Sequence, residues 1–176
     1  RRHALPGWSD RAIRVDHRDG LSHSVRPQAG GHLRRHPGVE GGEDVGQCGG
    51  VDLLQNLKSG LAVENLIYLK SVPELRAIGI EDGALRIGAC VTHRDLETGP
   101  LIAAHAPALA NVWGEIGNVR IRIAGTLGGN ILSGDPGYDG LPALIALNAV
   151  AVFEDTNGPR AVPAATAGTA ARTLKM

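Results

Sequence analysis

A chain of 176 residues is long enough to bury one core or to form two small lobes. Its 18 basic and 18 acidic side chains balance, so the charge gives no sign of a nucleic-acid or membrane-surface partner. Cys48 and Cys90 are too few for a disulfide framework, their spacing fits no metal cluster, and no apolar run is long enough to span a bilayer. The start of the chain also lacks the order of a signal peptide, and we therefore expect a cytoplasmic protein.

The first segment, residues 1–46, differs in composition from the rest of the chain. It contains arginine but no lysine, and glycine and proline occur throughout it. No window has sustained helical or strand periodicity. Its histidines have no familiar metal-site spacing, so scattered solvated side chains are a simpler interpretation than a metal site or an anion-binding patch. We expect residues 1–46 to be irregular and poorly ordered.

A glycine pair, Gly49-Gly50, precedes leucines at helical spacing in residues 51–59, and Gly60 stands where such a helix would end. A Gly-Gly turn that leads into a helix is a ready anion site, because the first N–H groups and the helix dipole point the same way. The residues before it, 43–47, make a poor strand. Residues 65–69 have the pattern of a buried strand.

Two further turns punctuate the middle of the chain. Glu81-Asp82-Gly83 separates two alternating runs, 77–80 and 85–91, which predicts a β-hairpin. Residues 92–95 have capping-box spacing with Asp95 in place of the usual Glu, which predicts a helix from His93. A catalytic role for His93 is conceivable, but a histidine on the helix surface is the simpler interpretation.

Pro107 opens another expected helix, in which Leu109, Val112, Trp113 and Ile116 form one apolar face. Trp113 could stack on a ligand ring, although core packing is the simpler explanation for an aromatic residue on such a face.

Residues 118–123 place apolar side chains at every second position, which predicts a half-buried strand. This strand would lead into a second glycine pair, Gly128-Gly129. Successive amides in such a turn form a concave nest for phosphate oxygens, and Thr126 and Asn130 add polar side chains at its rim. The alternative is an ordinary tight turn. Further on, we expect a short helix over 143–147 and a final hairpin built from 149–153 and 160–163.

Taken in order, these stretches resemble a known family, the FAD-binding medium subunit of molybdenum hydroxylases of the carbon monoxide dehydrogenase and xanthine dehydrogenase type. The matching stretches are residues 49–54, 72–78, 85–93, 116–120, 125–130, 135–139 and 141–144. Each is weak alone, but their order and spacing are specific. The sequence departs from the family at Val51, where a hydroxyl-bearing residue is usual, and in residues 1–46, which match no part of the family's opening strand–helix unit.

The resemblance implies an α+β fold of two lobes with FAD held between them. Residues 47–176 would form the FAD-binding domain, truncated because the family's separate C-terminal domain is absent. Two glycine loops would hold the FAD pyrophosphate, and a carboxylate would contact the nucleotide. The implied cofactor-binding residues are Gly46, Gln47, Cys48, Gly49, Gly50, Val51, Asp52, Leu53, Thr126, Leu127, Gly128, Gly129, Asn130 and Asp139. No catalytic side chain and no metal ligand is implied.

The resemblance also implies a function, that of an electron-transfer subunit in an FAD-dependent oxidoreductase. Substrate would be oxidised at a molybdenum cofactor in a large subunit. Electrons would then pass through iron–sulfur clusters of a small subunit to FAD in this chain, and on to an external acceptor. The flavin performs the redox chemistry, and the protein supplies binding and electrostatics. Two alternatives remain open: a stand-alone flavin oxidoreductase, and a non-catalytic remnant that binds no flavin.

Overall fold

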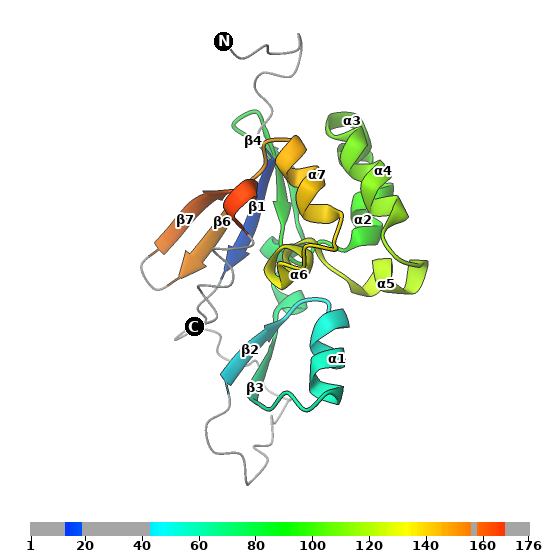
Figure 1. Ribbon diagram of the computed structural model, residues 1–176. Helices are drawn as coiled ribbons and strands as arrows, with labels where there is room; N and C mark the ends of the chain where they lie inside the picture. Colours follow the sequence, from blue (N-terminus) through cyan, green and yellow to red (C-terminus); the bar gives the residue numbers. More distant parts are fainter. Residues whose placement is uncertain (1–12, 19–42, 156–157, 168–176) are drawn as a thin grey trace.

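The structure, a computed structural model, describes residues 13–18, 43–155 and 158–167 (Figure 1). A five-stranded sheet with the order β4-β5-β1-β6-β7 forms the larger unit. Its strands are β1 (Ile13–Arg18), β4 (Ile78–Glu81), β5 (Ala84–Gly88), β6 (Val150–Asp155) and β7 (Gly158–Pro163). The central strand β1 runs parallel to both β5 and β6, whereas β4–β5 and β6–β7 are antiparallel.

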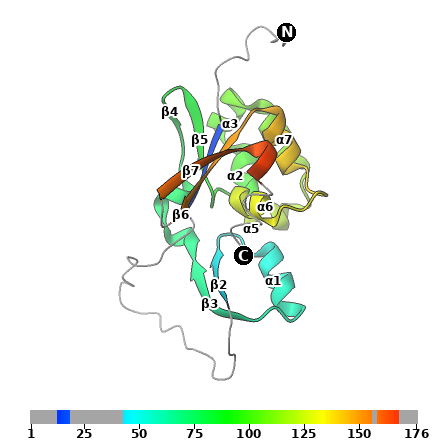
Figure 2. The ribbon, with the colours of Figure 1, turned by 60° about the vertical axis from the view of Figure 1, so that its left-hand side comes forward.

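A run of short helices lies beside this sheet (Figures 1 and 2). They are α2 (His93–Thr98), α3 (Pro100–His105), α4 (Pro107–Glu115), α5 (Val119–Ala124), α6 (Leu127–Ser133) and α7 (Gly140–Ala146). Apolar residues of α2, α3, α4, α6 and α7 share one buried cluster with β5, β6 and β7; its large members include Leu85, Ile87, Leu96, Ile102, Leu109, Trp113, Leu127, Ile131, Leu144 and Phe153. This cluster is the core that holds the second glycine loop in place.

The smaller unit consists of two parallel strands and one helix. β2 (Glu43–Gln47) pairs with β3 (Val63–Tyr68), and α1 (Val51–Lys58) connects them. Two 3₁₀ turns, η1 (Leu69–Ser71) and η2 (Pro73–Arg76), lead back to β4 of the larger sheet. The fold is therefore α+β with two units, as expected.

Several local predictions are confirmed. The capping box is complete, because Asp95 N donates to Thr92 Oγ1 over 3.1 Å and Thr92 N donates to Asp95 Oδ2 over 3.0 Å. The β4–β5 turn has positive φ at both Asp82 and Gly83, as a tight hairpin requires. Trp113 is fully buried in the core. The expected helices near 51–59, 107–116 and 143–147 and the final hairpin are present, although residues 156–157 of its turn lie outside the described residues.

The predicted strand over residues 118–123 is wrong, because this stretch forms helix α5. Asn118 caps it: its Oδ1 accepts from Arg120 N over 2.9 Å and from Ile121 N over 3.1 Å. Arg122 then anchors the helix through Glu97 Oε2, 2.9 Å away, and the carbonyl of Gly117, also 2.9 Å away. A six-residue alternation is short enough for capping and tertiary contacts to override it.

Strands also occur where the sequence indicates none. β1 lies inside the segment 1–46 expected to be irregular, and β2, the stretch interpreted as a poor strand, begins there and ends at Gln47. Both pair in parallel with strands from distant parts of the chain, so their hydrogen-bond partners supply what local periodicity does not. The remaining residues of that segment, 1–12 and 19–42, lie outside the described residues. The expected strand over residues 65–69 forms as β3, but within the described residues it pairs only with β2, and Tyr68 is 57% exposed, so the strand is less buried than expected.

Candidate functional site

The first glycine loop connects β2 to α1. Gly50, the N-cap of α1, has a φ of 82°, a conformation that glycine adopts without steric cost. The amides of Val51, Asp52 and Leu53 occupy the first helical turn, where no intrahelical carbonyl is in reach. These N–H groups and the dipole of the eight-residue helix give this loop the character of an anion site.

The second glycine loop is not the open amide nest that the sequence indicated. Three of its amides donate to backbone carbonyls: Leu127 N to Val91 O at 3.0 Å, Gly128 N to Ala89 O at 2.8 Å, and Asn130 N to Thr126 O at 3.0 Å. Gly129 N donates to the Thr126 hydroxyl, at 3.3 Å. The loop is instead a capped helix start, and Gly129 is the one exposed residue among residues 126–130.

The two glycines of this loop have different structural reasons. A Cβ on Gly128 would lie 2.7 Å from the Cβ of Ala89 and 2.9 Å from its carbonyl oxygen, so Gly128 is required for packing against the strand end. Gly129 is exposed, and a Cβ there would meet only the Thr126 hydroxyl, at 3.1 Å. Nothing in the described protein therefore demands a glycine at position 129 as strictly as at 128.

The two glycine loops lie against each other. A Cβ on Gly49 would lie 2.5 Å from the carbonyl oxygen of Ala124 and 3.2 Å from the Cα of Gly125. The backbone of the first loop thus approaches the residues just before the second loop more closely than any residue with a Cβ atom at position 49 would permit. The predicted site residues 46–53 and 126–130, far apart in the sequence, come together here.

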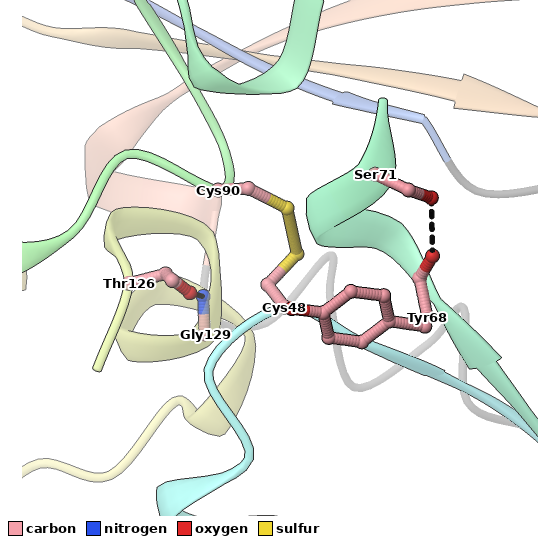
Figure 3. The surroundings of a disulfide bond; sticks show 6 residues. All are labelled: Cys48, Tyr68, Ser71, Cys90, Thr126 and Gly129. Carbon is pink, nitrogen blue, oxygen red and sulfur yellow. Dashed lines mark hydrogen bonds between the residues drawn. A yellow bond between two sulfur atoms is a disulfide. The ribbon is translucent and has the colours of Figure 1, made fainter. Parts of the chain in front are cut away.

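A disulfide reinforces this approach. Cys48 and Cys90, 42 positions apart in the sequence, are bonded, and their Cα atoms are 5.2 Å apart. Figure 3 shows the bond running from the turn after β2 to the loop after β5, with the Thr126–Gly129 turn of α6 nearby. Two cysteines in a chain of this length carry no pairing signal, so sequence reasoning missed this connection.

A third contact brings in the loop before α7. The hydroxyl of Tyr138 donates to Asp52 Oδ1 at 3.0 Å, which joins that loop to the first turn of α1. Asp139 follows directly, at the N-cap of α7, and its carboxylate is exposed and does not cap the helix. The structure thus places Asp139 next to the contact that spans the two units. Tyr138 was not among the predicted site residues.

His93 is a buried residue that contacts the backbone at the start of the second glycine loop. It is 5% exposed, so the prediction of a surface histidine is wrong. Its Nε2 lies 3.1 Å from the Thr126 carbonyl oxygen, its backbone N–H donates to Gly125 O at 3.0 Å, and its ring meets the edge of Trp113 at 6.2 Å between centroids. Burial lowers the pKa of His93, while the Thr126 carbonyl acts to raise it. A neutral ring that donates from Nε2 to the carbonyl satisfies this geometry.

The donor set fits an anionic nucleotide cofactor. The first turn of α1 offers amide donors. In the second loop, a ligand can come close to the backbone of the exposed Gly129, because no side chain covers it. Asp139 offers an acceptor for hydroxyl or amino groups. Asn130 Oδ1 is buried without a hydrogen-bond partner among the described residues. Within the same residues, no group of three or more His, Cys, Asp or Glu side chains could hold a metal ion.

Comparison with known proteins agrees with this arrangement. The family described as "FAD binding domain in molybdopterin dehydrogenase" matches residues 47–174. The carbon monoxide dehydrogenase medium chain of Hydrogenophaga pseudoflava is 40% identical over 118 residues, covering 66% of this chain and 41% of the relative. The putative xanthine dehydrogenase FAD-binding subunit of Escherichia coli K12 is 32% identical over 118 residues, covering 66% of this chain and 40% of the relative.

Solved structures show the same fold. A carbon monoxide dehydrogenase from Hydrogenophaga pseudoflava, lacking the Mo-pyranopterin moiety, superposes with a TM-score of 0.66 at 39% identity. Quinoline 2-oxidoreductase from Pseudomonas putida 86 superposes with a TM-score of 0.67 at 31% identity. Each match covers 69% of this chain and 43% of the other chain. The chain therefore spans about two fifths of the length of these relatives. In its described part, none of the helices is both long and apolar enough to cross a bilayer.

Proposed function

Because the chain belongs to the family of FAD-binding domains in molybdopterin dehydrogenases, we propose that it binds FAD and forms the flavin-carrying part of a molybdenum hydroxylase medium subunit. The observation that carries the proposal is the meeting of the two glycine loops. Gly49 and Gly50 open α1 against the residues that lead into Gly128 and Gly129.

The residues have distinct roles in this proposal. The first-turn amides of α1, at Val51 to Leu53, hold the pyrophosphate, because they carry positive partial charge and no intrahelical partner. Gly129 leaves room for the cofactor beside α6, and Asp139 accepts a hydrogen bond from the nucleotide. The hydrogen bond between Tyr138 and Asp52 holds the two units together beside the proposed site. FAD, when bound, accepts and passes on electrons, and the protein binds and orients it.

The remaining parts of the electron path are assigned to partner subunits. A large subunit would hold the molybdenum cofactor, and a small subunit would hold iron–sulfur clusters that deliver electrons to FAD, which an external acceptor then reoxidises. The chain's composition supports this division: an iron–sulfur cluster is commonly held by four cysteines, whereas this chain has two, and they are bonded to each other. Metal analysis of the purified chain should find no stoichiometric iron or molybdenum.

We place the FAD-binding domain at residues 47–176 and propose a cytoplasmic location. The family match begins at residue 47, which supports this boundary, although β1, the central strand of the larger sheet, comes from the preceding segment. A shortened chain that begins at residue 43 would test whether FAD binding requires β1.

Flavin titration tests the proposed site. Gly129→Ala and Asp139→Ala should each weaken FAD binding roughly tenfold, equivalent to about 1.4 kcal/mol. Gly137→Ala is the matched control: Gly137 lies in the loop before Asp139, is exposed, and a Cβ there would meet only Asp135 Oδ1, at 3.2 Å. Its FAD affinity should be that of the wild type. A folded wild-type chain that takes up no flavin would contradict the proposal and favour the non-catalytic remnant.

A further inference from the structure

The disulfide between Cys48 and Cys90 joins the two proposed cofactor loops almost directly. Cys48 immediately precedes the glycine pair that opens α1. Cys90 lies between Ala89 and Val91, whose carbonyl oxygens accept the amides of the second glycine loop. Each sulfur is therefore within one or two residues of backbone that belongs to, or hydrogen-bonds with, one of the two loops.

The two cysteines differ in how deeply they are buried. Cys90 is 1% exposed and packs in a small apolar cluster with Leu69 and Leu75. Its backbone N–H also donates to Leu75 O at 2.7 Å, which fixes its position on the larger unit. Cys48 packs against the same cluster but is less completely buried than Cys90. Because Cys48 is the more exposed of the two residues, we expect a soluble thiol to attack the bond there, while Cys90 stays in place.

Two noncovalent contacts between the units involve neither sulfur, and we expect them to persist when the bond is open. The Tyr138–Asp52 hydrogen bond and the close approach of Gly49 to Ala124 do not depend on either sulfur. Opening the bond thus loosens the first loop against the second without removing every contact that holds them together.

We propose that Cys48 and Cys90 are a reversible thiol–disulfide clasp that controls how firmly the two glycine loops are held around FAD. The closed clasp favours the binding geometry, and the open clasp reduces affinity for the cofactor, because part of the binding energy must then order the first loop. This proposal rests on the proposed FAD binding.

The redox step balances with a small-molecule disulfide such as oxidised glutathione. The Cys48 thiolate attacks the small disulfide and releases one small-molecule thiol, leaving a mixed disulfide on Cys48. The Cys90 thiolate then attacks the Cys48 sulfur, forms the intramolecular bond and releases the second small-molecule thiol. The two protein thiols lose two electrons and two protons in total, and the small disulfide takes up both.

Thiol alkylation followed by mass spectrometry tests the clasp without reference to flavin. The folded chain is equilibrated in buffers of varied ratio of reduced to oxidised glutathione, and alkylated thiols are counted. We expect a single transition between no free thiol and two, because the chain has two cysteines and both are in the bond. A bond that persists in reduced glutathione alone, or a pair that never closes in oxidised glutathione, would overturn the proposal.

FAD titration of the two forms tests the control of affinity. The oxidised chain should bind FAD at least about fivefold more tightly than the reduced chain. The variant Cys48→Ser should bind like the reduced wild type in both buffers, and circular dichroism should show that all forms are folded. Equal affinity in the two forms, or unfolding on reduction, would refute the clasp. If neither form binds FAD, the proposed function fails. The thiol count does not depend on flavin, so it still shows in that case whether the disulfide opens and closes.

Discussion

The hydroxyl of Tyr138 donates to Asp52 Oδ1 across 3.0 Å and so connects the loop before α7 with the first turn of α1. The two residues are 86 positions apart; Asp52 belongs to the proposed pyrophosphate site, and Tyr138 directly precedes the proposed contact Asp139. Burial, followed by the bond to Asp52, raises the pKa of Tyr138. The phenol is therefore protonated at neutral pH and can serve as the donor. This bond couples the two units at the place where the cofactor is proposed to bind.

Removing the hydroxyl should uncouple the units. Tyr138→Phe should lower the free energy of unfolding by about 1 kcal/mol, a usual net value for one hydrogen bond, and should also weaken FAD binding. Asp52→Ala should have a similar cost, and the double variant should cost little more than either single change. Urea unfolding of the four proteins gives this cycle, and strictly additive losses would show that the two side chains do not interact.

Acid should destabilise the protein through His93. The pKa of His93 is lowered in the fold, mainly by burial, so below about pH 6.5 the unfolded state binds the proton more readily than the folded state does. The contribution of His93 to stability is therefore complete above that pH, and is lost as the pH falls through the folded-state pKa.

The variant His93→Gln isolates this effect, because glutamine can still donate to the Thr126 carbonyl but does not titrate. Urea midpoints measured from about pH 7.5 to about pH 5 should fall more steeply in the wild type than in His93→Gln. The control His105→Gln, on helix α3, should retain the wild-type slope. The same slope in wild type and His93→Gln would contradict a buried, neutral His93.

The adjacent glycines of the second loop should separate folding from cofactor binding. Gly128→Ala places a Cβ against the backbone and side chain of Ala89 and should destabilise the apoprotein by about 1–3 kcal/mol. Gly129→Ala meets only the Thr126 hydroxyl and should change stability by less than about 1 kcal/mol. Thermal unfolding without flavin measures both. Equal destabilisation would mean that Gly129, like Gly128, is a packing residue, and its loss of affinity would no longer report contact with FAD.

Local chemistry explains which parts of the fold were predictable. The capping box at Thr92 and the positive-φ turn at Asp82 each depend on residues within a few positions, so the sequence alone indicates both. Residues 118–123 misled because their alternation is outweighed by the cap from Asn118 and the contact of Arg122 with Glu97. Strands β1 and β2 depend on parallel partners far along the chain, which no local pattern reveals.

The same distinction applies to the candidate site. Both glycine pairs could be located from the sequence, but paired glycines also suit an ordinary tight turn, so their assignment to FAD rested on the resemblance to the family. The hydrogen bonds that already occupy amides of the second loop could not be predicted, because their acceptors, Ala89 and Val91, lie in another part of the chain. The burial of His93 and the bond between Cys48 and Cys90 are likewise tertiary facts. What sequence identified was the residues; how they act required the geometry.

The approach of the first loop to the second can be tested at Gly49. A Cβ there would lie 2.5 Å from the Ala124 carbonyl oxygen, so Gly49→Ala must push the units apart. We expect a loss of about 1–3 kcal/mol in stability, together with weaker FAD binding. Gly79→Ala, in strand β4, is the matched control, because no atom lies within 4 Å of its added Cβ. Wild-type behaviour of Gly49→Ala would show that the loops do not meet as described.

Reduction of the Cys48–Cys90 bond should lower thermal stability. The bond spans 42 positions, and in the chain-entropy description a loop of this length stabilises the fold by roughly 4 kcal/mol. For a domain of this size, that loss corresponds to a fall in Tm of roughly 8–16 °C. Melting followed by circular dichroism, with and without a phosphine reductant, measures the shift. The double variant Cys48→Ser, Cys90→Ser should melt near the reduced wild type and show no response to the reductant, because it has no sulfur left to reduce. An identical Tm for oxidised and reduced wild type would mean that the bond does not constrain the chain, and a reductant effect that persists in the double variant would trace the shift to some cause other than this disulfide.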